Sequence, residues 1–189
     1  CQTEEIWIRG GVRVNPKARH RKPSGDIFRR SLELCLISPS AVMMTKELFY
    51  WVGGFDESFP VCEDYDLWLR IAARHPVFLI DTPLATKRGG HADQLSRSVW
   101  GMDRFRVLAI AKLLRFGLVG DRRQWALNSL RQKTSILAAG AAKRGKVDEA
   151  RKFQALLAEF LEGAGDDRTS HSGLCFEQRI SSTDKGALA

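Results

Sequence analysis

The pattern of apolar residues changes its period once along this chain, close to Ser96. Before that point, short apolar runs are separated by glycine and proline, as in "EEIWIRGGVRVN", where Gly10 and Gly11 lie between two such runs. This arrangement predicts a β-hairpin. After Ser96, apolar residues recur at the spacing of one helical face: Val99, Trp100, Phe105, Leu108, Ile110, Leu113 and Leu114. We therefore expect a mixed first part and a helical second part.

Three helices are expected after the change of period. The first carries the apolar residues named above, and the second is capped by Asp121 and reaches about Lys143. The third is capped by Asp148 and ends at Gly163. The last two are joined by "KRGKVD" and form one antiparallel pair, which is not repeated, so a solenoid is excluded. Residues 163–189 are polar and rich in small side chains, and we expect them to be disordered.

Smaller elements are expected in the first part. "IFRRSLELCLI" is ambiguous, whereas its end and the following "SAVMM" are typical of buried extended segments. Thr45 can cap a short helix, "KELFYWV", which the following Gly-Gly pair stops. A further helix is predicted from about Glu63 to Arg74. "VFLI", which lies between Pro76 and Pro83, is predicted to be a buried strand.

The net charge is +8, and much of it lies within residues 1–30. Basic side chains outnumber acidic ones in this segment: Arg9, Arg13, Lys17, Arg19, Arg21, Lys22, Arg29 and Arg30 against Glu4, Glu5 and Asp26. Such a patch can bind nucleic acid, anionic lipid headgroups or a phosphorylated substrate, or it is simply a solvated loop. No recognition-helix, zinc-finger or aromatic RNA-binding pattern accompanies the charge. Nucleic acid is therefore not expected as a partner.

Membrane-spanning and metal- or disulfide-bound classes are also disfavoured. Lys112 interrupts the apolar run "VLAIAKLL", and no run reaches the length that crosses a bilayer. The cysteines have neither metal-ligand nor redox-motif spacing: Cys1, Cys35, Cys62 and Cys175. We therefore expect a cytoplasmic protein, with the basic segment able to lie against the inner face of a membrane.

The stretch "GGFDESFPVCEDYDLWLRIAARHP", residues 53–76, is acidic in a chain of positive net charge. Carboxylates favour a helix N-terminus, because its free backbone N–H groups carry partial positive charge. This effect explains one or two acids, but not Asp56 and Glu57 ahead of the helix. Asp64 and Asp66 have the Asp-X-Asp spacing of a metal motif. Residues two apart on a helix point about 200° apart, however, so we reject this pair as a shared metal site.

"ISPSAVMMTKELFYWVGGFDESFPVCEDYDLWLRIA", followed by "RGGHADQLS", resembles the C-terminal, acceptor-side half of family 2 glycosyltransferases of the GT-A fold. That family shows a serine-bearing strand, a "vGgFDE" turn, an "EDyDLwlR" helix start and a downstream histidine. The resemblance covers roughly residues 4–115, and the joined motif is far more specific than its pieces. It implies an α/β fold: a partial GT-A, Rossmann-like domain over residues 1–95, followed by an α-helical extension over residues 96–162.

The resemblance also implies roles for individual residues. Asp64 matches the catalytic base of an inverting transfer from a nucleoside-diphosphate sugar to an acceptor hydroxyl, and Glu63 is a supporting acid beside it. A carboxylate in line with the hydroxyl accepts its proton as it attacks the anomeric carbon. The acceptor, a glycan or a lipid-linked sugar, is expected to contact the residues around this acid: Gly54, Phe55, Asp56, Glu57 and Trp68. For Phe55 and Trp68, core packing is favoured over sugar stacking.

The loop "TKRGGHADQLS" matches the part of the family that stabilises the departing nucleoside diphosphate. Lys87, Arg88 and His91 are the residues implied, together with a divalent metal, Mn²⁺ or Mg²⁺, for which His91 is the candidate ligand. A lone loop histidine is more often an ordinary loop residue. Its place after a Gly-Gly pair and the predicted strand makes the two interpretations about equal.

Two functions remain open from the sequence. The first is glycosyl transfer in cell-surface glycan synthesis. In the family, the uridine-binding strand and the true Asp-X-Asp motif precede the stretch that "TEEIWIRGG" matches, so the chain is expected to begin mid-domain and to lack most donor contacts. The second is a non-catalytic module that binds a protein or an anionic polymer through its basic face and helical hairpin. Binding of a nucleoside-diphosphate sugar favours the first, and salt-dependent retention on nucleic acid favours the second.

Overall fold

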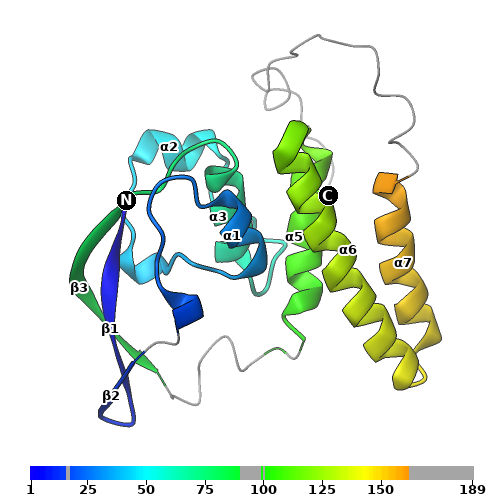
Figure 1. Cartoon of the computed structure of the whole chain (residues 1–189), viewed down its shortest axis with the longest axis horizontal. Coiled ribbons are helices and arrows are strands. Elements are labelled where there is room, and N and C mark those ends of the chain that lie inside the picture. The colour runs from blue at the N-terminus through cyan, green and yellow to red at the C-terminus, as the bar shows by residue number, and fades with distance from the viewer. Residues whose placement is uncertain (16–17, 90–98, 100, 162–189) are drawn as a thin grey trace, which may run out of the picture.

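The computed structural model of the chain describes residues 1–15, 18–89, 99 and 101–161. These ranges contain the strands β1 (Gln2–Arg9), β2 (Val12–Val14) and β3 (Leu79–Gly89). Short helical elements lie between β2 and β3: η1 (Ala18–His20), α1 (Phe28–Glu33), η2 (Pro39–Ala41), α2 (Lys46–Trp51) and α3 (Glu63–Ala72). Three longer helices follow: α5 (Asp103–Arg115), α6 (Gly120–Lys143) and α7 (Val147–Leu161) (Figure 1). The predicted α/β class, with helices following the strands, is confirmed.

The strands form a small mixed sheet in the order β2-β1-β3. β1 and β2 are antiparallel and form the predicted hairpin around Gly10 and Gly11, whose φ angles are 57° and 78°. β1 and β3 are parallel, with Ile6 opposite Thr86. Parallel neighbours need a long crossover connection. Here that connection contains α1, α2 and α3, and it therefore includes the whole acidic stretch.

The prediction of a buried strand over "VFLI" was wrong in its bounds and its burial. Val77 is buried, but Phe78 and Ile80 are 61% and 43% exposed, and β3 continues through Pro83 to Gly89. Proline has no N–H to donate and is tolerated on edge strands and at bulges. β3 is one of the two edge strands of the described sheet, and its register with β1 shifts where Pro83 lies opposite Glu4. The edge position and the register shift together allow β3 to continue through Pro83, although proline normally ends a strand.

The predicted cap of α2 is confirmed. The Thr45 hydroxyl accepts a hydrogen bond of 3.2 Å from the backbone N–H of Leu48, and the chain turns after the helix at Gly53, whose φ is 88°. The ambiguous segment "IFRRSLELCLI" forms α1 and then an extended stretch. Beyond it, Val42 bridges to Gln2 of β1. The buried extended segments expected at the end of "IFRRSLELCLI" and over "SAVMM" are therefore confirmed only in part, because η2 (Pro39–Ala41) interrupts them and Met43 is 74% exposed.

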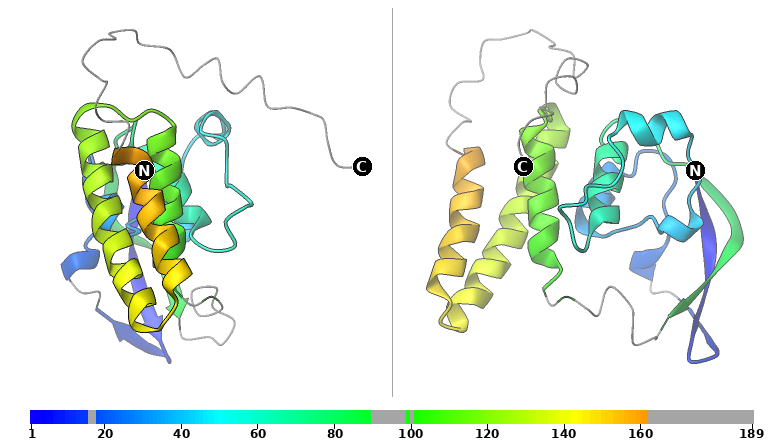
Figure 2. Two further views of the ribbon diagram at one scale, coloured as in Figure 1. Left: turned by 90° about the vertical axis from the view of Figure 1, so that its right-hand side faces the viewer. Right: turned by 180° about the vertical axis from the view of Figure 1, so that it is seen from behind.

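The three long helices stand side by side at one end of the molecule, with the sheet at the other end and α1 and α3 between them (Figures 1 and 2). α5 packs on α3, α6 packs on α1 and α5, and α7 packs on α6. One hydrophobic core includes residues from Ile27 in the connection to Phe160 in α7. α6 and α7 form the predicted antiparallel pair, but Asp121 and Asp148 lie in their first turns and do not cap them.

The boundaries 1–95, 96–162 and 163–189 stay predictions, because residues 90–98 and 162–189 lie outside the described ranges. No helix within those ranges is long and apolar enough to cross a membrane.

Candidate functional site

The acidic stretch folds into a turn that leads into α3. Gly54 has a φ of 63°, and a Cβ at this position would lie 3.3 Å from the Phe49 ring, so conformation and space both favour glycine. α3 begins after Cys62, whose φ of 65° is uncommon for a residue with a side chain. The first turn of α3 carries Glu63, Asp64 and Asp66. The turn therefore presents three carboxylates at one helix end.

Asp66 is buried and anchors an ion-pair cluster. Its Oδ2 accepts hydrogen bonds from Arg70 Nε at 3.0 Å, from Arg70 Nη2 at 2.8 Å and from Lys112 Nζ at 3.0 Å. Arg70 also donates to the carbonyl oxygens of Val52 and Gly54. This cluster fixes the Gly-Gly turn against α3, and Lys112 joins α5 to both.

Asp56 belongs to the same cluster. Its Oδ1 accepts from the backbone N–H and the hydroxyl of Ser58 at 2.9 and 2.6 Å, and its Oδ2 accepts from Lys112 Nζ at 2.6 Å. Burial raises the pKa of Asp56, but the hydrogen bonds from Lys112 and Ser58 outweigh it and lower the pKa to about 2. Asp56 is thus an ionised, fully engaged carboxylate.

The other predicted acceptor-binding residues lie in different environments. Phe55 is 42% exposed, and its ring meets Phe49 edge-on at 5.7 Å between centroids. Glu57 is exposed. Trp68 is only 3% exposed and packs in the core, so its ring has no face open to a sugar. The Gly54 carbonyl is occupied by Arg70. Acceptor contact stays a prediction for this set, with Phe55 and Glu57 as its accessible members.

Asp64 lies apart from the Lys112 cluster. Its Oδ1 accepts from the backbone N–H of Tyr65 at 2.7 Å, and its Oδ2 accepts from the thiol of Cys35 at 3.6 Å. The side chain is half-buried, and it forms no salt bridge with any residue that the structure describes. Glu63 beside it is also half-buried. Asp64 is therefore held in place by neutral donors.

Two thiols, Cys35 and Cys62, lie close enough to Asp64 to feel its charge, and the guanidinium of Arg106 acts on the same thiols. Burial raises the pKa of the Cys35 thiol well above its usual range, and the charge of Asp64 adds to the effect. Burial also raises the pKa of Cys62 to about 11, with the charge of Arg106 opposing it. Both thiols are thus protonated at neutral pH. Arg106 donates to Asp103 Oδ1 at 3.0 Å and lies over the Tyr65 ring, 5.8 Å from its centroid.

The described residues do not fit a divalent metal. Asp64 and Asp66 point to different neighbours, as helical spacing requires, and the oxygen of Asp66 already accepts from two cations. Within the described ranges, no group of three or more His, Cys, Asp or Glu side chains is placed to hold a metal ion. His91, the predicted metal ligand, lies outside those ranges.

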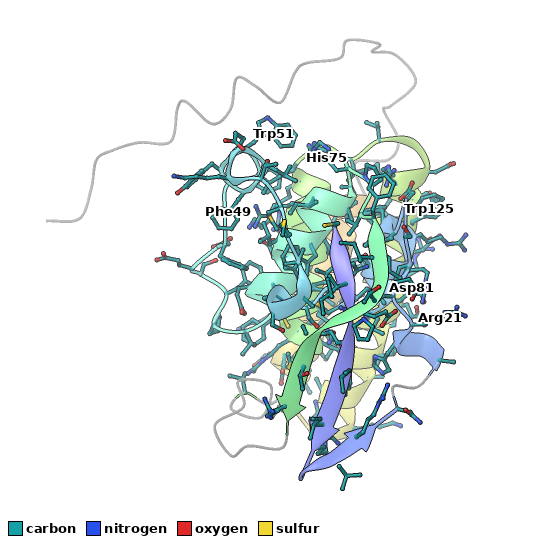
Figure 3. The ribbon with its side chains drawn as sticks, turned by 90° about the vertical axis from the view of Figure 1, so that its left-hand side faces the viewer. Arg21, Phe49, Trp51, His75, Asp81 and Trp125 are labelled. Carbon is teal, nitrogen blue, oxygen red and sulfur yellow. The ribbon has the colours of Figure 1, made fainter. Side chains whose placement is uncertain are left out.

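Lys87 of the predicted diphosphate-binding set belongs to a polar cluster that the sequence did not indicate. Its Nζ donates to Ser38 Oγ at 3.3 Å and lies 5.4 Å from the centroid of the Trp7 ring. The Ser38 hydroxyl donates to Glu5 Oε2 at 2.9 Å, and Lys22 pairs with the same oxygen at 3.0 Å. The parallel pairing of β1 with β3, seen side by side in Figure 3, places Lys87 opposite Trp7, on the strand that also carries Glu5. From the sequence alone, Glu5 and Lys22 were counted only as charges of the basic N-terminal segment, whereas in the structure they form a buried ion pair.

Residues 28–106 match the family model described as glycosyltransferase like family 2. Over this segment, which is less than half of the chain, the sequence is similar to that family. The matched segment runs from the start of α1 into α5 and includes the Gly-Gly turn, the start of α3 and β3. The resemblance seen in the sequence is confirmed over this segment, while β1, β2, α6 and α7 lie outside it. No curated protein and no solved structure matches the chain.

Proposed function

We propose that the chain forms the acceptor side of a glycosyltransferase of the GT-A fold and that Asp64 is the general base of an inverting sugar transfer. One observation carries the proposal. Asp56 and Asp66 are paired with Lys112 and Arg70, whereas Asp64 forms no such pair among the described residues. Of the aspartates in the acidic stretch, Asp64 is thus the one whose carboxylate is able to accept a proton from a substrate.

In the proposed reaction, the acceptor hydroxyl lies against Asp64. Its proton passes to the carboxylate as its oxygen attacks the anomeric carbon, and the bond from that carbon to the diphosphate breaks on the opposite face. The nucleoside diphosphate leaves with the bonding electron pair, and the anomeric configuration inverts. The protonated thiol of Cys35 orients Oδ2 without competing for the sugar as a thiolate. Glu63 is the supporting acid.

Lys87, Arg88 and His91 are proposed to bind the diphosphate, where positive charge stabilises the leaving group. A divalent ion, Mn²⁺ or Mg²⁺, with His91 as a ligand, would add to that charge in the complete protein. No step above depends on the ion. The proposed acceptor is a glycan or lipid-linked sugar in cell-surface glycan synthesis, used by a cytoplasmic protein whose basic segment faces the membrane.

The stereochemistry of the product tests this proposal. The complete protein is incubated with α-linked nucleoside-diphosphate sugars and candidate acceptors, and the new linkage is assigned by NMR. We expect a β-linkage. An α-linked product contradicts the inverting mechanism. Absence of sugar-nucleotide binding, combined with salt-dependent retention on nucleic acid, supports the non-catalytic interaction module instead.

A further inference from the structure

A polar pocket lies between the end of α1, the start of α5 and the middle of α6. Its volume is ≈ 390 Å³, and its lining consists of Glu33, Asp103, Ser129, Gln132, Lys133, Ile136 and Leu137. Small-molecule sites have volumes of about 300–1,000 Å³, so the pocket is large enough for a small ligand. Most of its lining comes from α6, which lies outside the segment that matches the family model.

Arg106 connects this pocket to the proposed base. Its Nη1 donates to Asp103 in the pocket lining, and its guanidinium covers the ring of Tyr65, the residue after Asp64. On the other side, Glu33 ends α1 two residues before the thiol that donates to Asp64. The pocket therefore lies close to the place where an acceptor would react at Asp64. A ligand in the pocket is then either a second molecule or another part of that acceptor.

The charges of the lining disfavour an anionic ligand. Glu33 and Asp103 are acidic, and the single cation in the lining, Lys133, already lies 3.9 Å from Asp103 Oδ1 with its side chain only 15% exposed. Phosphate or uronate would meet two carboxylates and one shared ammonium group. A neutral ligand with many hydroxyl groups would instead find carboxylate acceptors and an ammonium donor within one cavity.

We propose that this pocket is an acceptor subsite for a neutral, polyhydroxylated sugar unit adjoining the unit that reacts. This inference rests on the proposed function. The carboxylates accept hydrogen bonds from sugar hydroxyls, as does the Ser129 oxygen, whose own proton is donated to the Leu32 carbonyl at 3.2 Å. The Gln132 amide both donates and accepts, while Ile136 and Leu137 contact the C–H face of the ring. α6 thereby takes part in acceptor selection.

Titration of the ¹⁵N-labelled chain, followed by NMR, tests the subsite without requiring any transfer. The probes are the methyl glycosides of glucose, galactose, mannose and N-acetylglucosamine, with glucuronate as the anionic comparison. We expect at least one neutral glycoside to shift the backbone amides of Ser129, Gln132 and Lys133 in a saturable manner, and glucuronate to shift them far less.

Substitutions in the pocket lining test whether the chemical-shift changes come from binding in the pocket. Gln132→Ala and Lys133→Met are expected to weaken the binding of that glycoside at least about fivefold, or about 1 kcal/mol, the typical worth of a hydrogen bond. Gln132 is exposed, so its substitution leaves the core intact even if Lys133→Met disturbs it. Lys152→Met is the matched control, because this lysine is exposed on α7 away from the lining. It should leave binding unchanged.

The absence of saturable shifts with every neutral glycoside, or an equal response to glucuronate, overturns the subsite. The subsite and the proposed base can fail independently of each other. If Asp64→Asn eliminates turnover but no glycoside binds, the subsite fails and the base stands. If glycosides bind at these amides and Asp64→Asn keeps full turnover, the base fails and the pocket stands as a sugar-binding site.

Discussion

Lys112 divides the aspartates of the acidic stretch into two groups. It donates to Asp56 and Asp66, which hold the turn and α3 against α5, and it makes no hydrogen bond or salt bridge to Asp64. The aspartates therefore share one short stretch of sequence but differ in what they contribute. Asp56 and Asp66 stabilise the fold, and Asp64 is the aspartate that we propose as the general base.

Asp66→Asn is expected to lower the free energy of unfolding by about 3 kcal/mol, because it leaves the buried charge of Arg70 and part of that of Lys112 without a partner. Urea denaturation of the chain measures the change. Asp64→Asn is the matched control and should cost no more than about 1 kcal/mol, the worth of a charge at a helix N-terminus. Equal losses in the two variants would contradict the division.

Asp56 should make stability depend on pH in acid. Its pKa in the folded state is about 2, below the ordinary value of 3.8, so the unfolded chain binds its proton first. The stabilisation is complete above the unfolded value and disappears as the pH falls from about 4 through about 2. Asp56→Asn should flatten the stability profile in that window, whereas Glu57→Gln, an exposed neighbour, should not. An unchanged acid slope in Asp56→Asn would show that Lys112 does not stabilise the folded carboxylate.

At the scale of the element, residues close together in sequence predicted the helices α2 and α3 but not the extent of the strand β3. The start of α3 after the turn and the Thr45 cap follow from nearby residues alone, and both were predicted from sequence. The extent of β3 could not be predicted from sequence, because it is set by pairing with β1, a segment far away along the chain.

At the candidate site, the sequence located the acidic stretch but not the lysine that pairs with it. Lys112 appeared only as a break in an apolar run, since its contact with Asp66 depends on α5 packing on α3.

The cap of α2 gives a test at this scale. Thr45→Ala removes the oxygen that accepts from the Leu48 N–H and should cost about 1 kcal/mol, the usual worth of such a cap. Thr45→Ser keeps the oxygen and should stay close to wild type. Thermal unfolding of both variants provides the measurement. If serine is no better than alanine, the stabilisation comes from the methyl group of Thr45 and the capping account fails.

At the scale of the whole molecule, the three long helices complete the core of the segment that matches the family model. Ile110 and Leu113 of α5 and Leu130 of α6 are buried in the same cluster as Phe28 of α1 and Leu67 of α3. A second, much smaller cluster of Ala138, Ala141 and Ala150 lies between α6 and α7. The fold that presents Asp64 therefore depends on α5 and α6.

A chain that ends at residue 95 is expected not to fold cooperatively, because it exposes the core faces of α1 and α3 that α5 and α6 cover. Circular dichroism during heating should show a broad change without a transition. A chain that ends at residue 161 retains all the described helices and is the control. A sharp transition in the shorter chain would establish residues 1–95 as a domain that folds alone.

The most direct test of the central claim is the turnover of Asp64→Asn in the complete protein. Asparagine keeps the shape and one side-chain oxygen but cannot accept a proton. We expect kcat to fall by about 10²–10⁴, the usual contribution of general base catalysis, with the melting temperature almost unchanged. Asp148→Asn, the same substitution at an exposed aspartate in the first turn of α7, should retain most of the turnover. Near-normal turnover in Asp64→Asn, or loss of the folded state, would make this carboxylate structural and contradict the claim.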